Sequence, residues 1–151
     1  MKHTDKYMQI AIDEAHIGLQ AGEIPVGCVV VDTKTDTVVS KSANFVVRNN
    51  NPTLHAEMVC LSEANATLGS LYLESCDLYV TLEPCPMCAQ AISFYRIRRL
   101  YFGAYDPKRG GVDHGARIFN APSCFHIPEV YGGIREHECS DLLKDFFKSL
   151  R

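Results

Sequence analysis

The sequence predicts an α/β layered domain, in which helices cover a parallel or mixed β-sheet. Segments with apolar residues at every third or fourth position alternate along the chain with short apolar segments typical of strands. No linker, internal repeat or low-complexity tract divides the 151 residues, and this length suits one domain. We therefore predict a single domain over residues 1–151.

The first half of the chain predicts a helix, a hairpin and a second helix. A cap at Thr4 or Asp5 starts the first helix, and Gly22 ends it. Residues 26–31 form a buried strand, and residues 37–43 return beside it across a short turn.

The second helix is predicted to start at Asn51–Pro52, because proline is tolerated in the first helical turn, and to stop at Gly69. Its apolar side chains are expected to point inward: Leu54, Met58, Leu61 and Leu68.

The second half continues the alternation and ends in a helix. Leu78, Val80 and Leu82 alternate with Tyr79 and Thr81, which indicates a third strand. The next elements are a helix over residues 86–95, a strand near 100–104, a short helical piece near 116–119 and a strand over residues 124–130. The last is a helix that carries Leu142, Leu143, Phe146, Phe147 and Leu150.

Composition and cysteine spacing exclude several classes. The longest strongly apolar run, at residues 26–31, is too short to span a bilayer, and we expect a cytoplasmic protein. Seven cysteines at irregular spacing do not form a disulfide framework, and only Cys85 and Cys88 make a CxxC pair. The single cysteines are interpreted as small buried residues: Cys28, Cys60, Cys76, Cys124 and Cys139.

The net charge of −3 argues against indiscriminate binding to polyanions, but basic residues gather locally. Between residues 96 and 117 six basic residues occur with two acidic ones. This stretch indicates either a solvated face or a phosphate-binding surface. The basic residues are Arg96, Arg98, Arg99, Lys108, Arg109 and Arg117, and the C-terminus adds Lys144, Lys148 and Arg151.

Two short motifs predict a catalytic zinc site. His55 and Glu57 begin one helix, and Cys85 and Cys88 begin the next. A helix N-terminus favours thiolate over thiol. Two thiolates and one imidazole supply three zinc ligands and leave the fourth position open for water, which is the arrangement of catalytic zinc. Glu57 beside the metal would accept a proton from that water and return protons to the substrate.

Two interpretations outside the deaminase class compete with this one. A thioredoxin-like protein would use Cys85 and Cys88 as a redox dithiol, but would leave His55 and Glu57 without a role. A zinc-stabilised binding module would hold the metal without catalysis, and Glu57 would then be dispensable. The H-x-E…P-C-x-x-C pattern favours a nucleobase deaminase over both.

Over nearly its whole length the sequence resembles the tRNA-specific adenosine deaminase family of the cytidine-deaminase-like superfamily. The resemblance implies a three-layer α/β/α fold with a mixed five-stranded sheet and one Zn²⁺ per subunit, without an organic cofactor. It also implies a homodimer that deaminates the wobble adenosine of a tRNA anticodon to inosine, through attack of zinc-bound hydroxide on C6. It is carried by residues 24–27, Asn44, residues 52–57 and 78–88, Arg96 to Arg99, Phe102 to Ala104, Asp106 and residues 145–147.

The resemblance also suggests substrate contacts, each with a structural alternative. Asn44 would bind the purine edge, with Ala56 beside it, but an asparagine also suits a turn. Asp106 would face a ribose, or else cap a turn before Pro107. Phe147 would pack against the anticodon loop, or else belong to the core.

A guanine or cytosine deaminase that acts on free bases is the alternative within the class. Both kinds of enzyme share the motifs of the zinc site, and the basic stretch from Arg96 to Arg117 and the strand motif before Cys85 favour the tRNA enzyme.

Overall fold

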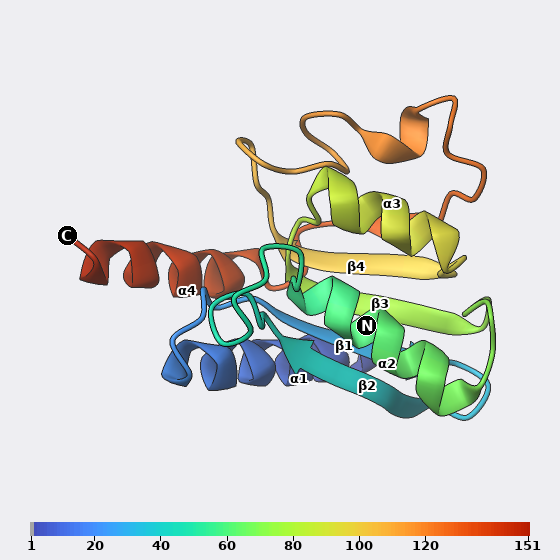
Figure 1. The fold of residues 1–151 in the computed structure, drawn as a ribbon, viewed down its shortest axis with the longest axis horizontal. Helices are drawn as coiled ribbons and strands as arrows, with labels where there is room; N and C mark the ends of the chain where they lie inside the picture. The colour runs from blue at the N-terminus through green and yellow to red at the C-terminus, as the bar shows by residue number, and fades with distance from the viewer. Residues whose placement is uncertain (1) are drawn as a thin grey trace.

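The computed structural model describes residues 2–151 and contains alternating helices and strands (Figure 1). In chain order these are α1 (Lys2–Gln20), β1 (Gly27–Asp32), β2 (Thr37–Ala43), α2 (Ala56–Leu68), β3 (Cys76–Leu82), α3 (Pro86–Phe94), β4 (Arg99–Ala104), the 3₁₀ helix η1 (Ile118–Asn120), β5 (Glu129–Tyr131) and α4 (Glu136–Ser149).

The five strands form one mixed sheet in the order β2-β1-β3-β4-β5. β1 runs antiparallel to both β2 and β3, whereas β3, β4 and β5 are parallel. The two parallel connections are crossovers, which place helical segments over the sheet. The predicted mixed five-stranded sheet is therefore confirmed.

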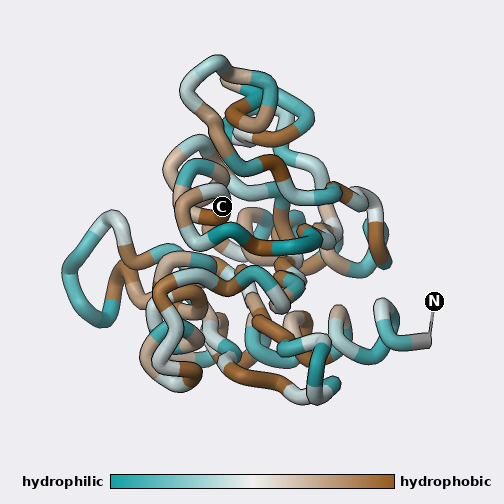
Figure 2. Tube along the Cα trace, turned by 90° about the vertical axis from the view of Figure 1, so that its right-hand side faces the viewer, coloured by the Kyte–Doolittle hydropathy of each residue, from teal (hydrophilic) through white to brown (hydrophobic). Residues whose placement is uncertain are grey.

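Helices cover both faces of this sheet. α1 and α4 pack on one face, and α2 packs on the other with α3 beside it (Figure 1). Each face has its own apolar cluster, with Leu61 and Leu78 in one and Met8 and Val29 in the other. In Figure 2 hydrophobic stretches run through the middle of the molecule, and further ones lie in the upper loop and along the lower edge. The three-layer α/β/α prediction is confirmed.

Burial on both faces explains one detail that the alternating pattern missed. Tyr79 and Thr81, which alternate with the apolar residues of β3, are 3% and 1% exposed. A central strand between two helix layers has no solvent face, so its polar residues are buried too. A buried polar group needs a hydrogen-bond partner. The Thr81 hydroxyl has one, because it accepts a hydrogen bond from the Gly27 N–H on β1 at 3.1 Å.

The starts of two helices and the exposure of one side chain differ from the predictions. α1 begins before the predicted caps Thr4 and Asp5. α2 begins at Ala56, because Asn51 accepts a hydrogen bond from the Thr53 N–H at 3.0 Å and closes a turn around Pro52. Leu68 was expected to point inward, but it lies in the last turn of α2 and is 37% exposed.

The last strand is also shorter than predicted. Within residues 124–128, His126 contacts α3 and the residues after it and not the sheet. Its carbonyl accepts a hydrogen bond from Ser93 at 2.7 Å, and its ring pairs with the Ile97 carbonyl at 2.8 Å. Pro128, directly before β5, has no N–H for the ladder. Only residues 129–131 therefore pair with β4.

The five single cysteines are all buried and carry free thiols. Within residues 2–151, no helix combines the length and the hydrophobicity that a membrane span requires.

Candidate metal centre

Two helix N-termini bring the candidate ligands together. His55 is the N-cap of α2 (φ −64°, ψ 155°) and Cys85 is the N-cap of α3 (φ −70°, ψ 171°). Neither side chain caps its own helix, so both remain available for other contacts. Pro86, at the first position of α3, has no N–H that would need a partner there. Because α2 and α3 lie on the same face of the sheet and start at the same end, His55 and Cys85 meet (Figure 1).

The ligand atoms of His55, Cys85 and Cys88 all lie within 4.8 Å of one another. Both sulfur atoms are 3.5 Å from His55 Nδ1. A tetrahedral zinc ion about 2.1 Å from nitrogen and about 2.3 Å from sulfur holds these atoms about 3.6 Å apart. The residues therefore fit a zinc ion bound through Nδ1 and two sulfurs, with one position left open.

The protonation of the two sulfurs also fits a dication. Hydrogen bonds from Cys88 and then His55 lower the pKa of Cys85 to about 4. The pKa of Cys88 is raised, because its thiol hydrogen bonds to the Cys85 thiolate and because it is buried. Without a metal the pair thus shares one proton, and a bound zinc ion replaces that proton and stabilises both thiolates.

Glu57 lies in the first turn of α2 and is 4% exposed. The pKa of Glu57 is raised to about 7, mainly by burial and in part by the neighbouring Cys85 thiolate. Glu57 and Cys88 each affect the pKa of the other, so the carboxyl group lies near the candidate ligands. A carboxyl group with this pKa exchanges protons readily near neutral pH.

Asn44 joins the end of β2 to the start of α2. Its Oδ1 accepts a hydrogen bond from the Ala56 N–H at 2.8 Å, and its Nδ2 donates one to the Ile24 carbonyl at 3.1 Å. Both partners are distant in the chain, so these contacts tie β2 to other segments and are not the local turn bond considered for Asn44. One amide hydrogen is left for a ligand, whereas the Ala56 N–H already has a partner.

Asp106 and Phe147 occupy different settings. Asp106 follows β4, and its Oδ1 accepts a hydrogen bond from the Arg109 N–H at 3.0 Å, which is the turn-cap role. Phe147 is 48% exposed on α4, with its ring edge-on to Phe146, so it does not belong to the core.

The structure divides the basic stretch between the two ends of the sheet. Arg96, Arg98 and Arg99 lie where β4 starts, far from the metal end, and they pair with Glu74, Asp77 and Glu129, respectively. Of the two interpretations left open for this stretch, a phosphate-binding surface can include only one of its halves, because the parallel strand β4 separates them.

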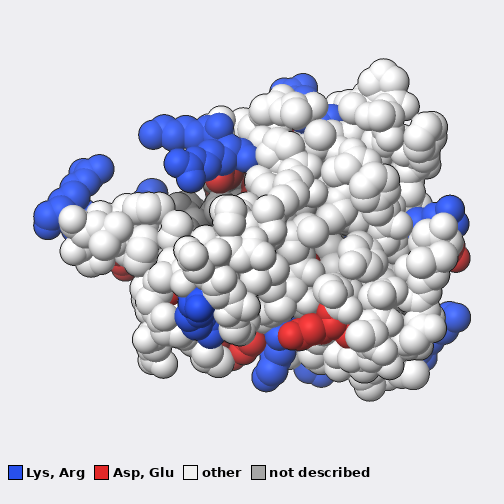
Figure 3. Space-filling view, viewed as in Figure 1, with Lys and Arg blue, Asp and Glu red and all other residues white. Residues whose placement is uncertain are grey.

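Only the second half of that stretch follows β4 toward the metal end. Lys108 and Arg109 make no ion pair within residues 2–151. Figure 3 shows one group of basic side chains near this loop and another at the far end of α4, both toward the left, the side on which α2 and α3 start in Figure 1.

Sequence reasoning missed Glu83, which organises the loop after β4. Its buried carboxylate accepts hydrogen bonds from the N–H groups of Asp106, Val112, Asp113 and His114 at 3.0–3.2 Å, and pairs with the His114 ring at 2.8 Å. This loop packs against the first turn of α3, so Glu83 also supports the metal site. A glutamate between a buried strand and Pro84 was the signal available in the sequence.

We expect Glu83→Gln to lower the free energy of unfolding by about 3 kcal/mol, because an amide nitrogen would replace an oxygen that accepts buried N–H groups. Burial alone would raise the pKa of Glu83, but the N–H donors lower it overall. The carboxylate therefore stabilises the fold above its unfolded pKa of about 4.3, and this contribution is lost as pH falls through the lower folded value.

Urea unfolding at pH 7 and at pH 3 measures both parts of this prediction. The difference between wild type and Glu83→Gln should shrink at the lower pH. Glu74→Gln is the matched control, since Glu74 forms an exposed pair with Arg96 and should change stability by less than about 1 kcal/mol. Equal effects of the two substitutions would contradict the role given to Glu83.

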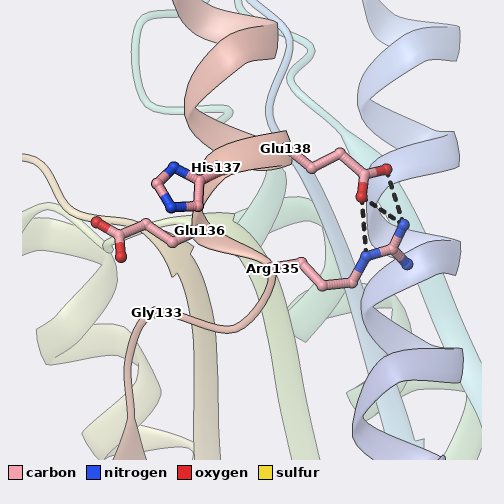
Figure 4. Close-up of a pocket in the computed structure, with 5 residues that line it drawn as sticks. All are labelled: Gly133, Arg135, Glu136, His137 and Glu138. Carbon is pink, nitrogen blue, oxygen red and sulfur yellow. Dashed lines mark hydrogen bonds and ion pairs between the residues drawn. The ribbon is translucent and has the colours of Figure 1, made fainter.

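Two surface hollows lie outside the metal cluster. One of about 480 Å³ is lined at the start of α4 by Gly133, Arg135, Glu136, His137 and Glu138 (Figure 4). There Arg135 hydrogen bonds to Glu138 at 2.6–3.0 Å, and Glu136 and His137 point to the opposite side. The other, of about 470 Å³, lies between η1 and β5. Neither is lined by a residue predicted for the site.

The fold and the His/Cys/Cys cluster together define a zinc-dependent hydrolase of the deaminase class. Residues 1–104 match the family model of the cytidine and deoxycytidylate deaminase zinc-binding region. This match sets aside the redox dithiol and the non-catalytic zinc module.

More specific relatives narrow this assignment. The chain is 44% identical over 144 residues to a tRNA-specific adenosine deaminase of Rickettsia bellii, covering 95% of this chain and 99% of the relative. A solved structure from work on A-to-I editing by tRNA:A34 deaminases at the wobble position of transfer RNA is 46% identical. It has a TM-score of 0.88 and covers 91% of this chain and 99% of its own. The chain belongs to the tRNA-specific adenosine deaminase family.

The matches to the alternative within the class are weaker. A guanine deaminase of Bacillus subtilis is 34% identical, but it has a TM-score of 0.62 and the match covers 66% of this chain and 63% of the other. A guanine deaminase of Nitrosomonas europaea has a TM-score of 0.81 but only 20% identity, and the match covers 94% of this chain and 83% of the other.

Proposed function

We propose that this chain deaminates adenosine to inosine at the wobble position of a tRNA anticodon. The observation that carries the proposal is the identity of 44% to a tRNA-specific adenosine deaminase over nearly the full length of both chains. An anticodon loop is single-stranded, so its base enters an active site without the cost of opening a duplex.

In this proposal His55, Cys85 and Cys88 hold the zinc ion, and Glu57 is the catalytic proton carrier. When bound, zinc supplies Lewis-acid chemistry that makes a water molecule acidic near neutral pH. Glu57 accepts a proton from the water whose oxygen bonds to C6. It then gives this proton to the ring nitrogen next to C6, takes the second proton from the same oxygen and passes it to the amino group, which leaves as ammonia. Burial raises the pKa of Glu57 and so favours return of the proton that it accepts.

The remaining contacts are assigned to the substrate by the same proposal. Asn44 uses its remaining amide hydrogen on the purine edge, and Ala56 lies against the base. Asp106 faces a ribose 2′-hydroxyl through its second carboxylate oxygen. Phe147, exposed on α4, packs against the anticodon loop. Lys108 and Arg109 follow Asp106 in the chain and would lie near the phosphates of the anticodon loop.

A deamination assay tests this function. The zinc-loaded protein is offered an anticodon stem-loop with adenosine at the wobble position beside free guanine, cytosine and adenosine, and products are identified by mass spectrometry. We expect inosine at the wobble position only. Conversion of a free base without reaction of the stem-loop would overturn the tRNA assignment.

We further propose that residues 1–151 act as one cytoplasmic deaminase domain that assembles as a homodimer. Phe94, Phe125 and Ile127 are 68%, 94% and 62% exposed. They belong to neighbouring segments, since Ser93 hydrogen bonds to the His126 carbonyl. Exposed apolar side chains gathered in this way are typical of an interface between protein chains.

The dimer prediction is checked by sedimentation equilibrium. We expect twice the chain mass of 16.8 kDa for wild type. Phe125→Ser should shift the mass toward that of one chain, because it removes the most exposed apolar side chain of the patch. Val47→Ser, an exposed apolar position on the loop between β2 and α2, is the control. A wild-type protein that stays monomeric would contradict the assembly.

A further inference from the structure

Arg48, on the loop between β2 and α2, is held rigidly although it lies at the surface. Its backbone N–H and its Nε both donate hydrogen bonds to Glu23 Oε2, at 2.9 and 3.2 Å. Its Nη2 donates a hydrogen bond to the Asn44 carbonyl at 2.6 Å. The guanidinium carbon lies 3.6 Å from the centre of the Phe45 ring, so the two groups stack.

The buried partner makes this arrangement unusual for a surface arginine. The Glu23 side chain is 1% exposed, whereas that of Arg48 is 30% exposed. Glu23 also accepts a hydrogen bond from the Val47 N–H at 3.0 Å, so the loop and the side chain are fixed together. A side chain that is already ordered loses little conformational entropy when it binds a ligand.

Asn44 connects this stack to the metal centre. Its carbonyl accepts the hydrogen bond from Arg48, and its side chain accepts the one from Ala56. Ala56 stands between His55 and Glu57, the candidate ligand and the candidate proton carrier. Asn44 therefore links the Phe45–Arg48 stack directly to the helix start that carries the candidate ligand and proton carrier.

The free part of Arg48 suits a flat ligand. Guanidinium has five N–H donors, and the hydrogen bonds to Glu23 and Asn44 use two of them. Within the described residues no hydrogen bond uses the other three. Phe45 covers one face of the guanidinium plane. Because Glu23 neutralises its charge, Arg48 offers a planar surface and hydrogen-bond donors rather than net positive charge.

We propose that the Phe45–Arg48 stack is a docking platform for the unpaired base next to the deaminated one in the RNA loop. Unpaired RNA bases stack on arginine planes and aromatic rings, and an ordered plane beside the reaction site matches that chemistry. The platform rests on the proposed function, and it adds a specificity-determining residue to it.

The test compares wild type with Arg48→Lys, which keeps the charge and removes the plane. Single-turnover deamination is measured on the adenosine stem-loop and on loops with an abasic nucleotide at either neighbour of the reacting base. For wild type, one abasic position should raise the half-saturating concentration roughly 10-fold, as expected for one lost stacked base. The rate at saturation should stay the same, because uniform binding is lost.

Arg48→Lys should raise the half-saturating concentration by a similar factor on the intact loop and should be insensitive to the abasic position. This loss of sensitivity separates a base contact from a general disturbance of the fold. Arg96→Lys is the matched control, because Arg96 also stacks on an aromatic ring, Tyr72, and pairs with Glu74, but at the far end of the sheet. It should leave both values unchanged.

Two results would overturn the platform. The first is an unchanged half-saturating concentration for Arg48→Lys on the intact loop, which would indicate a contact between the positive charge and a phosphate. The second is that wild type and Arg48→Lys are equally sensitive to the abasic positions. If Arg48→Lys does not fold, wild type is titrated with a loop that carries 2-aminopurine at the neighbouring position. Quenching of its fluorescence supports stacking, and unchanged fluorescence at both neighbours overturns it. Absence of inosine from the intact loop with wild type would instead contradict the proposed function itself.

Discussion

Glu57→Gln should lower turnover roughly 10³-fold while zinc content and fold stay unchanged. Glutamine matches glutamate in size but cannot accept and return the protons that deamination requires. Turnover is measured on the anticodon stem-loop, and zinc is quantified in the same sample. Glu63→Gln is the matched control, because Glu63 lies exposed on the same helix, α2. Retained turnover in a zinc-loaded Glu57→Gln protein would remove Glu57 from the proposed mechanism.

In the metal-free protein Glu57→Gln should increase the free energy of unfolding, although it abolishes most of the turnover. Burial raises the pKa of Glu57 to about 7, above its unfolded value of about 4.3. A carboxyl group with a raised folded pKa destabilises the protein as pH rises from the unfolded to the folded value. Metal-free Glu57→Gln should therefore be more stable than wild type at pH 8 and similar at pH 4. Urea unfolding of both proteins measures this, and a stability difference independent of pH would contradict it.

Loss of a zinc ligand is the second large effect that we expect. Cys88→Ser should reduce bound zinc well below one per chain and lower turnover to background, because a serine hydroxyl does not readily replace a thiolate. Chelation of zinc from wild type should have the same effect, and added zinc should reverse only the latter. At free zinc about 1,000 times the Kd, binding stabilises the fold by about 4 kcal/mol, so removal should also lower the melting temperature.

Cys124→Ser is the control for this prediction. Cys124 is also buried, but its sulfur contacts Ser93 and the His126 carbonyl, where a hydroxyl can make the same hydrogen bonds. Calorimetry in buffers of different ionisation enthalpy adds a second measurement. Zinc binding to metal-free wild type at pH 7 should release at least one proton, the one that the Cys85–Cys88 pair shares. Full zinc content in Cys88→Ser would contradict its assignment as a ligand.

Local patterns in the sequence predicted most of the elements and the four residues at the centre of the site. The period of apolar residues depends on the geometry of a single helix or strand, so β1, β2, α3 and β4 could be placed within one or two residues. The spacing of Cys85 and Cys88 at a helix start depends on local geometry too. The start of α2 was misplaced because an Asx turn at Asn51 competes with the helix-start signal of Pro52.

Contacts between distant segments decided the rest. Arg96, Arg98 and Arg99 precede Lys108 and Arg109 by only ten or so residues, yet β4 carries the two groups to opposite ends of the sheet. The carboxylate of Glu83 lies among N–H groups of residues 106–114, more than twenty positions later. Arg48 offers a fixed plane for a base only because Glu23, which is distant in the chain, and Phe45, on the same loop, hold its guanidinium group.

The sequence by itself determined the chemistry, because zinc ligands and a proton carrier are fixed by residue type and short spacing. The tertiary structure decided which charges surround the site and which side chains are held rigidly beside it. These properties depend on the order and direction of strands, and on hydrogen bonds between residues far apart in the chain, which no local pattern encodes.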